Sequence, residues 1–140
     1  MKILFVCRAN VGRSQMAESI FKKLSKKHQV ESAGVSPGKW EGKTLHEATH
    51  VLPSLKEIDI VADENISKKI TEDKVINNDI IIVIGVDKNT WPEYLKESKK
   101  VEFWDIEDPA HGDMDIHRKA RDKIKQKVKE LIEELDKKNN

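Results

Sequence analysis

Cys7 and Arg13 are separated by five residues in the stretch CRANVGRS, and Ser14 follows the arginine directly. A short apolar segment precedes this stretch, and a segment with helical spacing of apolar residues follows it. A loop that leads into a helix N-terminus directs backbone N–H groups, backed by the positive end of the helix dipole, to one point. Such a point binds a tetrahedral oxyanion. The spacing therefore predicts an oxyanion-binding loop over residues 7–14.

The side chains of this loop indicate what could happen to a bound oxyanion. The guanidinium group of Arg13 can hold two oxyanion oxygens at once, which a lysine ammonium does less well. Positive surroundings should favour the thiolate form of Cys7, which is the form that attacks phosphorus. Gly12 is expected to let the backbone curl without a side-chain clash. Most lone cysteines are buried core residues, but the chain has only four arginines, and this combination favours a catalytic nucleophile.

The segments around the loop alternate between expected strands and expected helices. Apolar or β-branched runs predict strands over residues 2–6 and 80–84. Residues 29–32, which end at a turn, and the shorter segment over residues 101–104 are expected to be the other two strands. Apolar residues spaced by three and four predict helices over residues 16–24, 44–52 and 116–135, the second of them disturbed by Pro53. Such alternation implies βαβ units and a doubly wound parallel sheet with helices on both faces. We therefore predict one α/β domain over residues 1–140.

A proton donor is expected after the fourth strand, because ligands of parallel sheets bind beyond the carboxyl ends of strands. Phosphoryl transfer to Cys7 leaves an oxyanion that needs a proton, and one carboxyl group can supply it and later activate water. The candidates in this segment are Asp105, Glu107 and Asp108. Asp108 is favoured because Pro109 stiffens the loop beside it, although an Asp-Pro pair is more often turn chemistry alone.

These residues carry a resemblance to a known family. The segment VCRANVGRSQMAE, residues 6–18, resembles the signature of low-molecular-weight protein tyrosine phosphatases and of the related arsenate reductases. The segments ESAG, residues 31–34, and DPAHG, residues 108–112, resemble further family segments in the same order. The resemblance implies a flavodoxin-like, four-stranded parallel sheet and a phosphocysteine mechanism that needs no metal and no cofactor.

The resemblance also implies roles for single residues. Cys7 would be the nucleophile, Arg13 would bind the phosphoryl group and Asp108 would be the general acid. Asn10 would hold the shape of the loop, and Ser14 would donate a hydrogen bond to the thiolate. The residues expected to contact substrate lie in the loop and on the walls above it, and they are Arg8, Ala9, Asn10, Val11, Gly12, Ser14, Trp40 and His111.

The expected substrate is a phosphorylated protein or a small phosphate ester, with inorganic phosphate as product or inhibitor. Phosphotyrosine is the first candidate, although family members often have aromatic residues after Asp-Pro and this chain has Ala110 and His111. Trp40 could supply a wall for a flat ring, or it could be core packing.

Arsenate reduction is the main alternative function. Arsenate has the shape of phosphate, and residues 103–110 are more similar to the reductase branch of the family. Reduction takes two electrons from sulfur, however, and residues 85–92, where further relay cysteines would be expected, contain none. A reductase with Cys7 alone would need an external thiol partner.

A zinc metalloprotease is a remote alternative, because His46-Glu47-x-x-His50 matches the H-E-x-x-H pattern formally. Histidines four apart share one helical face. The longer version of the pattern requires a glycine where this chain has Pro53, and no residue is clearly placed as the third ligand. An exposed polar helix face is the simpler interpretation.

The composition adds few constraints on partners. The 26 basic and 25 acidic residues nearly cancel, which does not point to nucleic acid or a membrane as partner. A single cysteine cannot form an internal disulfide, and the chain shows neither a signal-peptide layout nor a membrane-spanning apolar run. A cytoplasmic location is expected.

Overall fold

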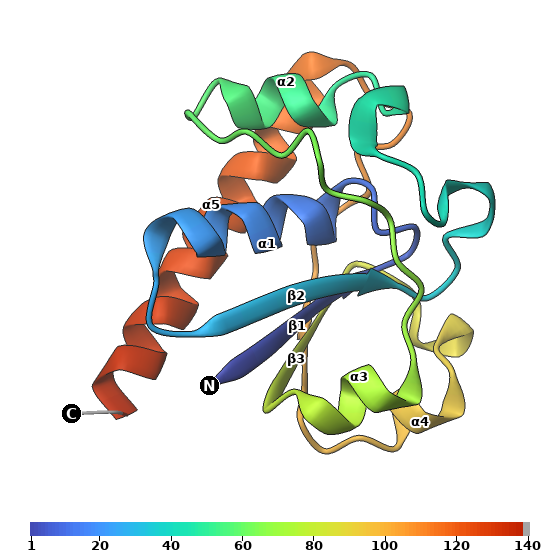
Figure 1. The fold of residues 1–140 in the computed structure, drawn as a ribbon, viewed down its shortest axis with the longest axis vertical. Coiled ribbons are helices and arrows are strands. Elements are labelled where there is room, and N and C mark those ends of the chain that lie inside the picture. Colours follow the sequence, from blue (N-terminus) through green and yellow to red (C-terminus); the bar gives the residue numbers. More distant parts are fainter. Residues whose placement is uncertain (139–140) are drawn as a thin grey trace.

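The computed structural model describes residues 1–138 and contains a four-stranded parallel sheet with the strand order β2-β1-β3-β4 (Figure 1). The strands are β1 (Lys2–Cys7), β2 (Gln29–Gly34), β3 (Ile80–Ile84) and β4 (Val101–Trp104). β1 pairs with β2 on one side and with β3 on the other, so Cys7 ends a central strand. The predicted four-stranded parallel sheet is confirmed, with β1 and β2 slightly longer than expected. The last two residues of the predicted domain, 139–140, lie outside the described residues.

Helices cover both faces of the sheet, as predicted (Figure 1). One face carries α1 (Arg13–Leu24), α2 (Val51–Lys56) and α5 (Met114–Lys138), and the other carries α3 (Glu72–Asn77) and α4 (Glu93–Lys96). Alternate residues of β1 enter different cores: Ile3 and Phe5 pack under α1 and α5, whereas Leu4 and Val6 pack toward α3 and α4. This double burial explains why the strand is apolar at consecutive positions.

The helix predicted over residues 44–52 is wrong. The chain forms a short 3₁₀ turn at Leu45–Glu47, and α2 begins only at Val51. Pro53 therefore lies in the first turn of α2 instead of disturbing the end of a helix. A proline is tolerated there because the N–H groups of the first turn have no acceptor within the helix.

The two helices on the second face are too short for periodicity to predict. α3 has six residues and α4 has four, and single apolar side chains, Val75 and Leu95, bury them against the sheet. α3 begins at a capping residue, Thr71, whose hydroxyl oxygen accepts a hydrogen bond from the backbone N–H of Lys74 at 3.2 Å. Across residues 1–138, none of the helices combines the length and apolar character that crossing a membrane requires.

Candidate active site

The predicted loop lies between a central strand and a helix, as the sequence indicated. Cys7 is the last residue of β1 and is 3% exposed, and α1 begins at Arg13. Gly12 stands at the cap position, and among residues 1–138 no side chain caps the first N–H groups of α1. These N–H groups remain free to donate to a ligand at the loop, which is the arrangement that favours an anion.

A cavity of about 320 Å³ opens above the loop. Its walls are residues 47–51, which end at the first residue of α2, and residues 108–112, which follow β4. The predicted site residues that line it are Cys7, Arg8, Ala9, Val11, Gly12, Arg13, Trp40, Asp108 and His111. The structure thus brings residues from four distant segments together. Asn10 and Ser14, also predicted to bind substrate, are fully buried and lie outside the lining of this cavity.

Asp108 faces the arginines of the loop. Its carboxylate oxygen Oδ2 lies 3.5 Å from Nη2 of Arg13 and 3.9 Å from Nη2 of Arg8. Arg13 is almost completely buried and donates from Nη1 to the carbonyl oxygen of Ile106 at 3.0 Å. Of the three carboxylates considered from the sequence, Asp108 alone lines the cavity that contains Cys7. A proton on Asp108 could therefore reach a leaving group in this cavity.

Asn10 is the left-handed residue of the loop, with φ of 57°. Its side-chain oxygen accepts hydrogen bonds from the backbone N–H of Lys68 at 2.8 Å and from Nε2 of Gln15 at 3.1 Å. Its amide nitrogen donates to the hydroxyl oxygens of Ser14 at 2.7 Å and Ser32 at 2.9 Å. A backbone N–H can only donate, so the contact with Lys68 fixes which way the Asn10 amide points.

This fixed amide sets the direction of a buried hydrogen-bond chain. Ser32 accepts from Asn10 and donates to Oε1 of Glu18 at 2.6 Å. Ser14 also accepts from Asn10, and its hydroxyl oxygen lies 3.0 Å from the sulfur of Cys7. The hydroxyl proton of Ser14 is thus free for the sulfur, and a donor at this position stabilises a thiolate.

Sequence reasoning missed the contributions of Ser32 and Glu18, although both lie in segments that resembled the family. The sequence signal that could have revealed them is a polar residue in a strand that pairs with an apolar strand. Ser32 of β2 is such a residue, because it pairs with Phe5 of β1. Glu18 is 5% exposed and also forms an ion pair with Lys22 at 2.7 Å. A charged residue as buried as Glu18 needs hydrogen-bond partners, and Ser32 of the neighbouring strand β2 supplies one.

The side-chain clash expected at Gly12 is not found. Its φ is −105°, and a Cβ added there would meet no atom within 4 Å. A position near the loop that does need a glycine is Gly85, directly after β3, where φ is +65°. A Cβ on Gly85 would collide with the guanidinium group of Arg13 and with the carbonyl oxygen of Ile106. Gly85 therefore makes room for the arginine of the loop.

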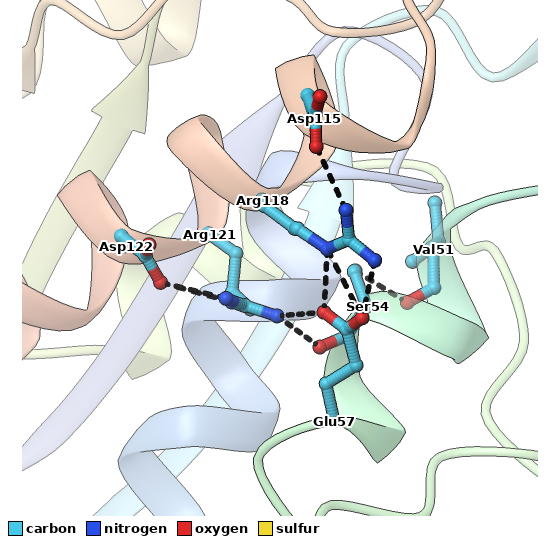
Figure 2. Close-up of polar contacts among 7 residues, drawn as sticks. All are labelled: Val51, Ser54, Glu57, Asp115, Arg118, Arg121 and Asp122. Atoms are coloured by element: carbon cyan, nitrogen blue, oxygen red, sulfur yellow. Dashed lines mark hydrogen bonds and ion pairs between the residues drawn. The ribbon is translucent and has the colours of Figure 1, made fainter.

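An ion-pair cluster holds α2, which follows the cavity wall, against α5 (Figure 2). The Glu57 carboxylate, just after α2, accepts two hydrogen bonds from Nε of Arg118, both at 3.0 Å, and one from Nη2 at 2.7 Å. Nη1 of Arg121 donates to Glu57 at 2.7 Å and to the carbonyl oxygen of Ser54 at 2.8 Å. Hydrogen bonds from Arg118, and then from Arg121, lower the pKa of Glu57 to about 2.

The helix required by the zinc-protease interpretation does not form. His46 lies in the 3₁₀ turn, and its Nε2 is 4.0 Å from Oδ2 of Asp63. His50 precedes α2, and its ring packs against that of His117 with 5.0 Å between the centroids. Within residues 1–138, no three histidine, cysteine, aspartate or glutamate side chains are grouped so that they could hold a metal ion.

Comparison with known proteins agrees with this geometry. The family model described as low molecular weight phosphotyrosine protein phosphatase matches residues 2–140. The chain therefore belongs to this family. Its fold is also that of a solved low molecular weight protein tyrosine phosphatase from T. tengcongensis, with 27% identity, a TM-score of 0.79, and coverage of 96% of this chain and 99% of the other.

The relatives carry different functional names. Arsenate reductase 1 of Staphylococcus epidermidis is 32% identical over 124 residues, which are 88% of this chain and 89% of the relative. The protein-arginine-phosphatase of Bacillus subtilis is 29% identical, and the match covers 98% of each chain. A solved mutant of the arginine phosphatase YwlE carries a phosphorylated active-site serine. This mutant is 26% identical to the chain and superposes on it with a TM-score of 0.82. The match covers 98% of this chain and 97% of the mutant's chain.

Proposed function

We propose that the protein hydrolyses phosphate monoesters through a phosphocysteine intermediate, with Cys7 as nucleophile, Arg13 as phosphoryl-binding residue and Asp108 as general acid. The observation that carries the proposal is that all three residues line one cavity, with Asp108 Oδ2 3.5 Å from the Arg13 guanidinium. The Cys7 thiolate attacks phosphorus while the bond from phosphorus to the ester oxygen breaks. Asp108 gives its proton to that oxygen.

The second half of the reaction uses the same carboxyl group in reverse. Asp108, now a carboxylate, takes a proton from a water molecule whose oxygen attacks the phosphocysteine. The bond between phosphorus and sulfur breaks, inorganic phosphate forms and the Cys7 thiolate is restored. The free N–H groups at the start of α1 and the Arg13 guanidinium hold the phosphoryl oxygens in both steps. Neither step needs a metal ion or a cofactor. The mechanism requires Cys7 to stay a reduced thiolate, and the reducing cytoplasm would keep it in that state.

Phosphotyrosine in a protein is the substrate that we propose within this class. Trp40 lines the cavity that contains Cys7 and could flank a phenyl ring. Because one relative is named a protein-arginine-phosphatase, a phosphoarginine peptide belongs in the same substrate panel. No partner beyond the phosphorylated molecule is required.

Arsenate reduction is the second candidate, supported by relatives with that name. Arsenate would form an ester with the Cys7 sulfur and lose an oxygen as water. Two electrons from sulfur must then reduce the arsenic, and Cys7 can provide only one of the two sulfurs that end as a disulfide. With a single cysteine in the chain, the other must come from an external thiol such as glutathione or glutaredoxin.

One experiment separates the two candidates. Purified protein is assayed side by side for hydrolysis of p-nitrophenyl phosphate and phosphotyrosine and phosphoarginine peptides, and for arsenate-dependent oxidation of glutathione or glutaredoxin. We expect steady hydrolysis that does not depend on added thiol beyond keeping Cys7 reduced, and that is lost in Cys7→Ser. Negligible hydrolysis together with multiple turnovers of arsenate reduction would overturn the proposal in favour of the reductase.

A further inference from the structure

We propose that Arg8 recognises a second anionic group on the leaving group, so that the protein prefers phosphate esters bearing a carboxylate or phosphate near the ester oxygen. This inference rests on the proposed function and narrows its substrate class. It concerns the part of the substrate that departs, whereas Arg13 serves the phosphoryl group that is transferred.

Arg8 is placed at the mouth of the cavity, next to the proton donor. It follows Cys7 directly, lines the cavity, and its side chain is 60% exposed. Among residues 1–138, its only carboxylate within 4.0 Å is Asp108, at 3.9 Å. Arg8, Arg13, Asp108 and His111 also line a second hollow, which therefore adjoins the Cys7 cavity. Since Asp108 must approach the ester oxygen to protonate it, a cation beside Asp108 lies close to the leaving group.

The proposed reaction removes the charge partner of Arg8. Asp108 has to be protonated, and therefore neutral, when it acts as the general acid. Arg13 is then engaged by the phosphoryl oxygens. Arg8 is left as a cation without its partner at the moment of bond cleavage, and a guanidinium group pairs well with a carboxylate or a phosphate. An anion on the leaving group would replace the lost charge of Asp108.

The remaining charges of the cavity do not oppose such an anion strongly. In the described part of the chain, Glu47 is the only carboxylate other than Asp108 that lines it. Its carboxylate lies 3.5 Å from Nζ of Lys43, so its charge is partly balanced. Three histidines, His50, His111 and His117, also line it, and imidazoles are neutral or positive but never anionic.

The anion could belong to a small ester or to an acidic residue beside a phosphotyrosine, and the test has an arm for each source. In the first arm, kcat/KM is measured for 3-carboxyphenyl phosphate and for its methyl ester, which differ by one charge on the same ring. In the second arm, a phosphotyrosine peptide with aspartate on both sides of the phosphotyrosine is compared with the same peptide carrying asparagine there. In each arm, kcat/KM for the charged substrate is divided by kcat/KM for the uncharged one. This ratio is determined for the unmodified chain, Arg8→Gln and Lys39→Gln. Lys39 is exposed and lies outside the lining of the cavity, so its variant removes one positive charge near the site without touching it.

We expect a ratio above one in at least one arm for the unmodified chain, falling about fivefold or more in Arg8→Gln, the effect expected of one charge-assisted contact. Lys39→Gln should keep the ratio. A ratio that Arg8→Gln leaves unchanged in both arms, or that Lys39→Gln lowers equally, overturns the role of Arg8 while hydrolysis itself stands. Absence of hydrolysis for every ester removes the proposed function and this inference with it.

Discussion

The hydroxyl oxygen of Ser14 lies 3.0 Å from the sulfur of Cys7 and accepts a hydrogen bond from Asn10 at 2.7 Å. The contact from Asn10 leaves the Ser14 proton for the sulfur, so the buried chain that starts at Glu18 ends in a donor to the proposed nucleophile. Because Ser14 is fully buried and outside the cavity lining, its hydroxyl supports the thiolate from within the protein.

Ser14→Ala should therefore weaken the nucleophile without changing the charge of the site. We expect kcat for p-nitrophenyl phosphate to fall by about 10- to 100-fold, the share of a hydrogen bond to a charged group. Alkylation of Cys7 by iodoacetate at neutral pH should slow in parallel. Ser19→Ala, a buried serine on the same helix, is the matched control. Equal losses in the two variants would mean that helix packing, not the contact with sulfur, is responsible.

Asp108→Asn tests the proton donor. The variant keeps the shape of the side chain but cannot supply a proton, so hydrolysis of phenyl phosphate should fall by about 10²–10⁴. Loss on p-nitrophenyl phosphate should be smaller, because nitrophenolate departs readily without a proton. Asp105→Asn and Glu107→Gln are the controls, since both residues lie outside the lining of the Cys7 cavity. A larger loss in either control would show that the choice of Asp108 is mistaken.

Gly85→Ala should displace Arg13 and not Cys7. The added methyl group would collide with the guanidinium group and the Ile106 carbonyl oxygen that anchors it, and overpacking of this kind costs about 1–3 kcal/mol. We expect vanadate to bind about tenfold more weakly, measured by inhibition. The effect of Gly85→Ala should shrink in an Arg13→Ala background. Fully additive losses would indicate a general backbone disturbance.

Much of the site could be predicted because its residues lie at the ends of strands that are easy to recognise. β3 is an unbroken β-branched run and β4 is apolar at three of its four positions, and the predicted bounds of both match the observed ones. Once the sheet is parallel, Cys7 at the end of β1 and Asp108 after β4 must lie at the same edge. Residue types and sheet topology together were sufficient to predict that Cys7, Arg13 and Asp108 lie close to one another, as they do in one cavity.

Features that depend on tertiary contacts could not be predicted in this way. The segment over residues 44–52 has helical spacing, but packing and Pro53 place the helix start at Val51. Gly85 has to be a glycine because the Arg13 side chain, which comes from the loop after a different strand, packs against it. No local sequence pattern reveals this contact. Likewise, Glu57 meets its arginines from α5 across about sixty residues of sequence.

The Glu57 cluster gives a prediction for stability as a function of pH. Glu57 has its ordinary pKa of 4.5 when the chain is unfolded and a pKa of about 2 when it is paired with Arg118 and Arg121. A lowered pKa in the folded state means that the carboxylate stabilises the fold fully above about pH 4.5. This contribution is lost progressively as the pH falls from 4.5 to 2, because the unfolded state binds the proton more readily than the folded state does in this range.

Glu57→Gln should therefore lower Tm at neutral pH, and its difference from the unmodified chain should narrow steadily between pH 4.5 and pH 2. Below that window the two proteins should unfold at similar temperatures, as both then carry a neutral group at this position. Glu130→Gln serves as control, because this exposed carboxylate contacts Gln126 on the same helix and joins no two elements. Thermal unfolding followed by circular dichroism across the pH range provides the measurement. A difference in Tm that stays constant down to pH 2 would show that Glu57 acts through packing alone, and that its ion pairs do not secure α2 against α5.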